Sequence, residues 1–169
     1  NVNSLGVRLP QVLDWLAANP VDVLALQELK LTDDKFPADA FAAAGYQAQW
    51  FGQKTYNGVA LLSRTPATDV LKNIPGFDDE MARVITGTVD GMRVIGAYFP
   101  NGQEPGSDKF EYKMEWLTAL RIANGPNLQA VIPRYSVSIA CCLSVQRFDG
   151  GSNVGDALRY RVSEVGLVR

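Results

Sequence analysis

The chain of 169 residues contains no histidine, so it lacks the commonest general base near neutral pH. Its only cysteines, Cys141 and Cys142, are adjacent. Neighbouring cysteines seldom bridge each other or form a metal site alone, and we interpret them as reduced side chains in the core of a cytoplasmic protein. No apolar run approaches the ~20 residues of a membrane-spanning helix. No basic leader precedes an apolar stretch, so the sequence indicates no secretion signal.

Length and hydrophobic content favour one globular domain. A hydrophobic fraction of 47% over this length is sufficient for a sizeable core. The chain opens on Asn1 rather than on a methionine, inside a segment that the sequence predicts to be structured. We therefore expect this chain to be a piece of a longer protein.

The composition changes near residue 121. No lysine follows Lys113, and no acidic side chain occurs between Glu115 and Asp149. Chance in a short segment is one explanation, and a different origin for the last third of the chain is the other. We divide the chain into residues 1–121 and a divergent tail, 122–169, and interpret the tail as frameshifted or otherwise non-native sequence.

Hydrophobic periodicity predicts three helices before residue 122. A repeat that begins at Leu9 predicts a helix with Pro10 in its first turn and its end at Asn19. An alanine-rich stretch predicts a second helix over 34–44, which Gly45 closes with a left-handed cap. The predicted apolar face of the third helix consists of Phe110, Met114, Leu117 and Leu120.

Strands are predicted between these helices. Asp90 and Gly91 have the residue types of a two-residue hairpin turn. The predicted strands cover residues 21–26, 46–50, 58–63, 83–89 and 92–98, and a further buried strand is a candidate at 137–145. Helices interleaved with strands and hairpins predict a layered α/β sandwich with a mixed sheet.

Polar residues follow several of the apolar stretches, at the strand ends where open α/β sheets place their sites. Glu28 would be the natural ligand for a hard cation, because Mg²⁺ prefers one or two carboxylates, several waters and substrate phosphate. A simply solvated carboxylate is the alternative for this residue. The polar clusters lie at Asn1–Ser4, Gln27–Lys30, Lys54–Gly58 and Tyr98–Gly102.

Five stretches of residues 1–121 resemble, in order, motifs of the exonuclease III family of abasic-site DNA endonucleases, part of the wider endonuclease/exonuclease/phosphatase superfamily. They read NVNSLGVRLPQVLDWL, DVLALQELKL, GQKTYNGVALLSR, GAYFPNG and KFEYKMEWL. The resemblance implies a hydrolase of the exodeoxyribonuclease III type and the N-terminal half of a four-layer fold. It also implies that the first strand and the tryptophan of the family's W-N-x-N motif would precede Asn1.

The resemblance implies a role for each matched residue. Asn1 and Asn3 correspond to paired active-site asparagines, Glu28 to the Mg²⁺-binding glutamate, and Tyr98 to the tyrosine that contacts the scissile phosphate. Glu28, Asn1 and Tyr98 should then converge on one polar rim, with the carboxylate within ~15 Å of the phenol. Supporting positions are Gln27 and Lys30, and the implied DNA contacts are Tyr56, Arg83, Asn101 and Lys109.

Several of these side chains also have ordinary structural explanations. Lys109 could lie on a solvated helix face rather than against phosphate. Tyr112 and Trp116 are interpreted as packing residues of the last helix rather than as base-stacking residues. The acidic stretch Asp78–Glu80 is interpreted as a solvated cap or loop.

The tail departs from the family pattern. Beyond Arg121 the family has a strand that ends in G-D-x-N and a C-terminal S-D-H motif, and neither occurs here. The stretch Asp149–Asn153 has the right residue types at the wrong spacing. We therefore expect this chain to be weakly active or inactive alone.

The resemblance implies Mg²⁺ as the cofactor, with Mn²⁺ as a substitute, and double-stranded DNA with abasic sites or 3′ ends as the substrate of base excision repair. We expect a monomer without a membrane partner, associated with the nucleoid in a bacterial cytoplasm. A non-catalytic nucleic-acid-binding remnant and another superfamily phosphoesterase are the alternatives. The sequence does not decide between abasic-site incision, 3′–5′ exonuclease and 3′-phosphatase activity.

Overall fold

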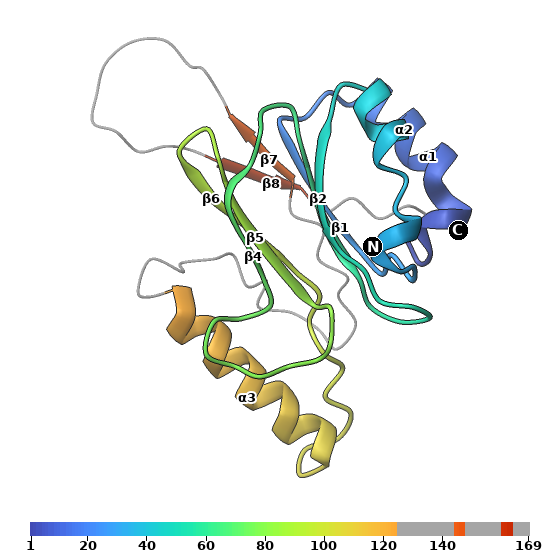
Figure 1. The fold of residues 1–169 in the computed structure, drawn as a ribbon. Helices are drawn as coiled ribbons and strands as arrows, with labels where there is room; N and C mark the ends of the chain where they lie inside the picture. Colours follow the sequence, from blue (N-terminus) through green and yellow to red (C-terminus); the bar gives the residue numbers. More distant parts are fainter. Residues whose placement is uncertain (125–143, 148–159, 164–169) are drawn as a thin grey trace.

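The computed structural model describes residues 1–124, 144–147 and 160–163. Outside these ranges lie residues 137–143 of the candidate strand, which include Cys141 and Cys142, and the stretch Asp149–Asn153. The elements, in chain order, are α1 (Leu5–Ala18), β1 (Val23–Gln27), the 3₁₀ helix η1 (Asp33–Lys35), α2 (Ala38–Ala43), β2 (Gln47–Phe51), β3 (Val59–Ser63), β4 (Thr68–Lys72), β5 (Val84–Val89), β6 (Met92–Ala97), α3 (Asp108–Asn124), β7 (Ser144–Arg147) and β8 (Tyr160–Ser163) (Figure 1).

The strands form two sheets. One has the order β2-β3-β1-β7-β8, and the other has the order β4-β5-β6. Helices α1 and α2 lie on one side of the five-stranded sheet, and α3 lies beyond the three-stranded sheet (Figure 1). The predicted layered α/β architecture is confirmed.

The central strands are buried on both faces, because the two sheets pack against each other. In β1, Leu24 and Leu26 belong to the apolar cluster under α1 and α2. Their neighbours Val23 and Ala25 pack in the second cluster, together with Ile85 of the three-stranded sheet. The period-two alternation of a strand thus divides one apolar run between two layers.

The third layer of packing joins α3 to the outer face of the three-stranded sheet. Trp116 is fully buried there and Leu120 nearly so, together with Val84 and Ala97. Both aromatic residues of α3 interpreted as packing residues do pack: Tyr112 also lies against this cluster. Met114 differs from the prediction, because the face of α3 that packs on the sheet is centred on Trp116 and leaves Met114 46% exposed.

Every described strand pair is antiparallel, whereas the sequence predicts a mixed sheet. The reason is the position of β3, which returns from β2 and pairs with both β2 and β1. β1 and β2 point in the same direction but never pair, because β3 lies between them. Strand β4 is an element that the sequence pattern did not predict.

Two helix predictions need correction. Helix α1 begins at Leu5 rather than near Leu9, so Pro10 lies inside the helix and not in its first turn. The predicted helix over 34–44 divides into η1 and α2, because Pro37 disfavours a helical conformation at Phe36, which is extended. Gly45 has the predicted left-handed conformation, with φ of 83°.

The predicted hairpin is confirmed. Asp90 and Gly91 both have positive φ and join β5 to β6 in register, with Val89 opposite Met92. Within the described ranges, no helix is long and apolar enough to span a membrane.

Candidate active site

The N-terminal segment runs beside the residues that follow β1. The backbone N–H groups of Val2 and Ser4 donate to the carbonyl oxygens of Gln27 and Glu28, at 2.9 and 2.8 Å. The N–H of Leu5 donates to Leu29 in the same way. This pairing determines where α1 begins, and it places the asparagines of the N-terminal segment beside Glu28.

The Glu28 carboxylate is the centre of a polar network. Its Oε1 accepts hydrogen bonds from Asn1 Nδ2 at 2.7 Å and from the Tyr98 hydroxyl at 2.8 Å. Its Oε2 lies 3.1 Å from Lys30 Nζ, and that ammonium group also donates to Asn3 Oδ1 at 2.5 Å. The predicted convergence of Glu28, Asn1 and Tyr98 on one rim is confirmed.

The backbone of this rim is in an uncommon conformation. Glu28 and Lys30 have φ of 57° and 54°, and Asn3 and Ser4 have φ of 44° and 89°. Left-handed conformations of residues other than glycine each cost ~1–3 kcal/mol and cluster at functional sites. Three members of the network, Asn3, Glu28 and Lys30, thus have strained backbone, as does Ser4 beside them.

The network determines the charge state of its members. Burial raises the pKa of Glu28, but the hydrogen bonds from Asn1, Tyr98 and Lys30 together outweigh burial, so the net pKa is lowered. Burial, reinforced by the hydrogen bond to Glu28, raises the pKa of Tyr98 to about 12. Near neutral pH the rim thus presents a carboxylate and a protonated phenol.

Gln27 connects the two sheets just below the rim. Its side chain is 1% exposed, and its Nε2 donates to the carbonyl oxygen of Ala97 at 2.7 Å. Since Gln27 ends β1 and Ala97 ends β6, this bond aligns Glu28 with Tyr98. The location of Gln27 is therefore consistent with its predicted supporting role.

Arg83 lies directly behind Tyr98. The N–H of Tyr98 donates to the Arg83 carbonyl oxygen at 2.7 Å, and Arg83 Nη1 lies 3.4 Å from the Tyr98 carbonyl oxygen. The guanidinium carbon is 5.2 Å from the centre of the Tyr98 ring, within the range of a cation–π contact. The structure thus brings Arg83 to the rim.

The loop before β3 closes the other side of the rim. Leu29 N–H donates to the Gly58 carbonyl oxygen at 3.2 Å, and Gly58 N–H donates to that of Ala82 at 2.9 Å. A Cβ at Gly58 would lie 2.8 Å from the Leu29 Cβ, and φ of Gly58 is 86°, so the close approach requires glycine. Tyr56, near the tip of this loop, is 67% exposed.

The remaining predicted DNA contacts lie after Tyr98. Asn101 is exposed, and its Oδ1 accepts a hydrogen bond from the N–H of Gln103 at 3.1 Å. Lys109 is exposed in the first turn of α3. Among the described residues, neither side chain hydrogen-bonds to Glu28.

Comparisons with known proteins identify the family of the chain. The model of the endonuclease/exonuclease/phosphatase family matches residues 1–156. The chain belongs to this family. The resemblance to the exonuclease III type is confirmed by similarity to exodeoxyribonuclease III of Haemophilus influenzae, which is 30% identical over 122 residues, covering 65% of this chain and 46% of that protein.

Solved structures of the family share the fold. A variant of the 3′ phosphatase NExo from Neisseria, bound to a product DNA hairpin, is 54% identical with a TM-score of 0.71, over 73% of this chain and 49% of that chain. An AP endonuclease from Archaeoglobus fulgidus is 36% identical with a TM-score of 0.70, over 73% and 48%. The chain thus spans about half the length of the relatives that it matches.

This family is normally dependent on a divalent metal, and the rim has the right donors for one. Glu28 offers carboxylate oxygens at a rim where its side chain is 19% exposed, and Asn1 offers an amide oxygen. Mg²⁺ binds to one or two carboxylates and completes its coordination with water and phosphate, so these residues fit it. The described residues contain no group of three or more His, Cys, Asp or Glu side chains that could hold a metal ion.

Sequence reasoning missed several residues that support the site. The Gln53 side-chain oxygen accepts hydrogen bonds from Asn57 Nδ2 at 2.8 Å and from the N–H of Ala82 at 3.0 Å, which holds the loop before β3. Asp79, interpreted as solvated, is half-buried and accepts a 2.8 Å hydrogen bond from the Tyr112 hydroxyl. A pairing of residues this far apart in the chain leaves no local signal in the sequence.

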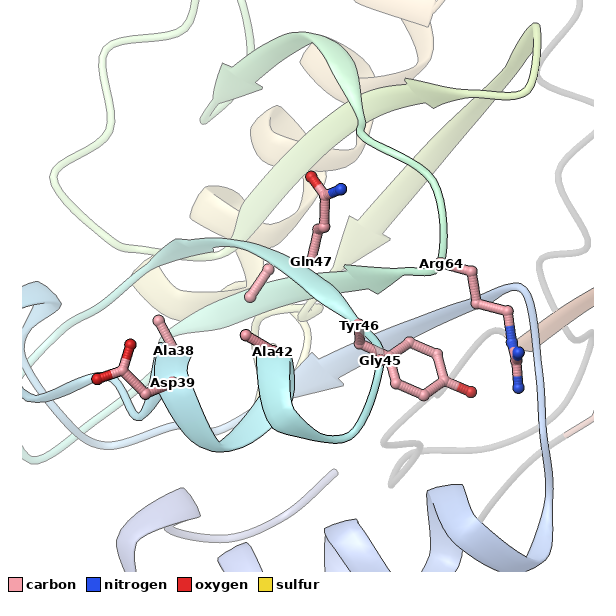
Figure 2. Close-up of a pocket in the computed structure, with 8 residues that line it drawn as sticks. Ala38, Asp39, Ala42, Gly45, Tyr46, Gln47 and Arg64 are labelled. Carbon is pink, nitrogen blue, oxygen red and sulfur yellow. The ribbon is translucent and has the colours of Figure 1, made fainter.

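A pocket away from the rim lies between α2 and β2 (Figure 2). Tyr46 lines it with a buried ring whose hydroxyl donates to the Val21 carbonyl oxygen at 2.9 Å, and Arg64 lies 5.4 Å from the ring centre. Its lining contains none of the rim residues. The pocket is therefore not part of the candidate active site.

Proposed function

We propose that the protein is a Mg²⁺-dependent DNA-repair phosphoesterase of the exonuclease III type that acts on double-stranded DNA. The observation that carries the proposal is the Asn1–Glu28–Tyr98–Lys30 network at one rim, with Arg83 beside it. Mn²⁺ is expected to substitute for Mg²⁺. A nucleoid-associated, monomeric protein of base excision repair is part of the same proposal.

Each rim residue has a defined task in this proposal. Glu28 and Asn1 would hold the cation, which when bound supplies positive charge to the non-bridging phosphate oxygens. Tyr98 remains protonated, and its single O–H, which donates to Glu28 in this structure, would turn to donate toward the scissile phosphate, where negative charge develops, when DNA binds. Lys30 holds the Glu28 carboxylate in place and balances its charge, while Asn3 holds Lys30.

Polar and aromatic residues around the rim would position the DNA. Arg83, Asn101 and Lys109 offer hydrogen-bond donors to backbone phosphates, which fix register without reading the bases. Tyr56 offers an exposed ring to a groove of the duplex. With these contacts, the protein should recognise the backbone and the ends of a DNA duplex rather than its base sequence.

Processing of 3′ ends is the activity that we favour. The 54% identical relative is described as a 3′ phosphatase and as a 3′–5′ exonuclease, whereas the 36% identical relative is described as an AP endonuclease. The greater similarity to the first relative supports a 3′-phosphate or 3′-terminal nucleotide as substrate. Abasic-site incision at the same rim is the second candidate.

The test compares residues 1–169 with the Glu28→Gln variant, in Mg²⁺ and in chelator. We expect Mg²⁺ to tighten binding of a duplex with a 3′-phosphate, and Glu28→Gln to remove that dependence. Hydrolysis of the 3′-phosphate or of an abasic site by this chain should be weak, since it has no histidine base and general-base catalysis contributes ~10²–10⁴-fold.

Two results would contradict the proposal. An affinity for DNA that is the same in Mg²⁺ and in chelator would show that the rim does not use a cation to bind DNA. Efficient, chelator-sensitive hydrolysis would show that the expectation of weak activity is wrong and that residues beyond the described ones supply the missing base.

A further inference from the structure

Two of the proposed DNA contacts come from different sheets. Tyr56 lies in the loop between β2 and β3, which belong to the five-stranded sheet. Arg83 directly precedes β5 of the three-stranded sheet. A DNA duplex presents its phosphates and grooves at fixed spacings, so both residues can bind one duplex only if their separation fits it.

The side-chain amide of Gln53 joins the two segments that carry these residues. Its Oε1 accepts hydrogen bonds from Asn57 Nδ2 at 2.8 Å and from the backbone N–H of Ala82 at 3.0 Å. Asn57 follows Tyr56 in the chain, and Ala82 precedes Arg83. One oxygen atom is thus bonded to the neighbour of each proposed DNA contact.

Other contacts reinforce this junction, which we call the Gln53 clamp and define as Gln53, Asn57, Met81 and Ala82. Gln53 Nε2 and Asn57 Nδ2 lie 3.5 and 3.3 Å from Met81 Sδ, a weak acceptor. The N–H of Gly58 donates to the Ala82 carbonyl oxygen at 2.9 Å. Asn57 is 5% exposed and Ala82 is 1% exposed, so little water reaches the clamp and an unmade hydrogen bond there would be costly.

The loop held by the clamp has an unfavourable backbone conformation. Thr55 and Asn57, on either side of Tyr56, have φ of 73° and 52°. Such left-handed residues persist only where surrounding contacts hold them. The Asn57 carbonyl oxygen also accepts a hydrogen bond from the N–H of Lys30 at 3.1 Å, which connects the clamp to the rim. The position of Tyr56 therefore depends on the clamp rather than on local backbone preference.

We propose that Gln53 is a positioning residue for DNA binding: its amide fixes Tyr56 and Arg83 relative to each other, so that both reach one duplex. The inference rests on the proposed function, since it assumes that Tyr56 and Arg83 contact DNA. Gln53 acts through these residues and does not itself contact the duplex. A loop that is already ordered loses less conformational entropy when DNA binds, and the clamp raises the affinity in this way.

The first test compares binding of a DNA duplex at low salt by residues 1–169 and by the Gln53→Met variant, which keeps the length of the side chain but removes its oxygen. The variant should bind roughly threefold to tenfold more weakly, the ordering cost of one side chain. In a chain that carries both Tyr56→Ala and Arg83→Ala, Gln53→Met should have no further effect, because the side chains that Gln53 positions are gone. An effect of the same size in that chain would overturn the inference.

Gln49→Met is the matched control. Gln49 is also half-buried and lies in β2, just before the loop, but its side chain makes no hydrogen bond to another described residue. The control should leave the affinity for DNA unchanged. A Gln53→Met effect that is no larger than that of Gln49→Met would overturn the inference.

A measurement without DNA separates this inference from the proposed function. The amide proton of Ala82, which donates to Gln53 Oε1, should exchange with solvent roughly threefold to tenfold faster in Gln53→Met, the effect of losing one hydrogen bond. Gln53→Glu keeps a side-chain oxygen at this position, so the Ala82 amide should stay protected in that variant.

The exchange rates decide the clamp whether or not DNA binds. A rate at Ala82 that Gln53→Met leaves unchanged, or that Gln53→Glu raises by as much, would overturn the positioning role even if the parent chain binds DNA. If the parent chain does not bind DNA, the proposed function fails, and the assignment of the clamp to DNA recognition fails with it.

Discussion

The flank of β1 and its C-terminal end lie in regions built in opposite ways. Beside the strand, α1 and α2 cover an apolar cluster in which Phe41 is fully buried and the helices have ordinary conformations. At the end of the strand, the rim around Glu28 is polar, and Glu28, Lys30 and Ser4 have positive φ. One region gains stability from burial, whereas the other holds strained backbone in place through long-range hydrogen bonds.

The contrast shows how this fold can support a strained site. Burial of apolar side chains contributes ~1.5–3 kcal/mol for each large residue, which is similar to the strain of one left-handed residue, and the apolar cluster has more large residues than the rim has left-handed ones. The apolar region therefore offsets what the rim costs. Substitutions should then separate the two regions: those in the apolar cluster should change the free energy of unfolding, and those at the rim should change ligand binding more than stability.

The largest expected effect is that of Phe41→Ala in the apolar cluster. Phe41 is 0% exposed and its ring lies 5.6 Å from that of Phe36, so the truncation should lower the free energy of unfolding by ~3–5 kcal/mol. Urea denaturation measures this. Well below the unfolding transition, the affinity for DNA should be unchanged. A loss of affinity without a loss of stability would contradict the separation of the two regions.

A smaller effect, of opposite sign, is expected for Ser4→Gly. Ser4 has φ of 89° and makes no side-chain capping hydrogen bond, so glycine should relieve strain and raise the free energy of unfolding by ~1 kcal/mol. Ser107→Gly is the control, because the Ser107 hydroxyl accepts from Phe110 N–H and donates to Glu104 at the start of α3. The control should lower stability, and the same sign for both would mean that the rim is not strained at Ser4.

The smallest expected effect is the pH dependence contributed by Glu28. Its pKa is lowered in the folded state, so its contribution to stability is present above the ordinary pKa of ~4.3 and is lost as the pH falls through the lower folded value. The stability difference between the parent and Glu28→Gln should therefore shrink in acid. Glu104→Gln, at an exposed carboxylate, is the control. A difference that grows as the pH falls would mean that the network does not stabilise the charged form.

Local patterns predicted the regular elements well where a single face or a turn determines them. The strand predicted at 21–26, which the structure has at Val23–Gln27, followed from apolar length, and the Asp90–Gly91 turn followed from turn chemistry. The predicted start of α1 was wrong, because the backbone pairing of Leu5 with Leu29 determines where the helix begins, and that pairing is not local. The prediction that Met114 lies on the apolar face of α3 was wrong for the same reason, because its exposure depends on which face of α3 meets the sheet.

The candidate site was predicted through resemblance rather than through spacing. From strand-end chemistry alone, a glutamate such as Glu28 is more often a solvated carboxylate. The motifs around Asn1 and Tyr98 provided the partners, and the structure brings both within hydrogen-bonding distance of its Oε1. The roles of these residues in catalysis and DNA binding stay predictions.

By itself, the sequence determined the α/β class, the buried central strands, the hairpin and the family, because apolar periodicity, turn residues and ordered motifs are all local properties of a chain. Only the tertiary structure decided that β3 separates β1 from β2, that Ser4 and Glu28 adopt left-handed conformations, and that Asp79 meets Tyr112. Each of these depends on hydrogen bonds between residues far apart in the chain, whose free energy exists only when the layers have packed.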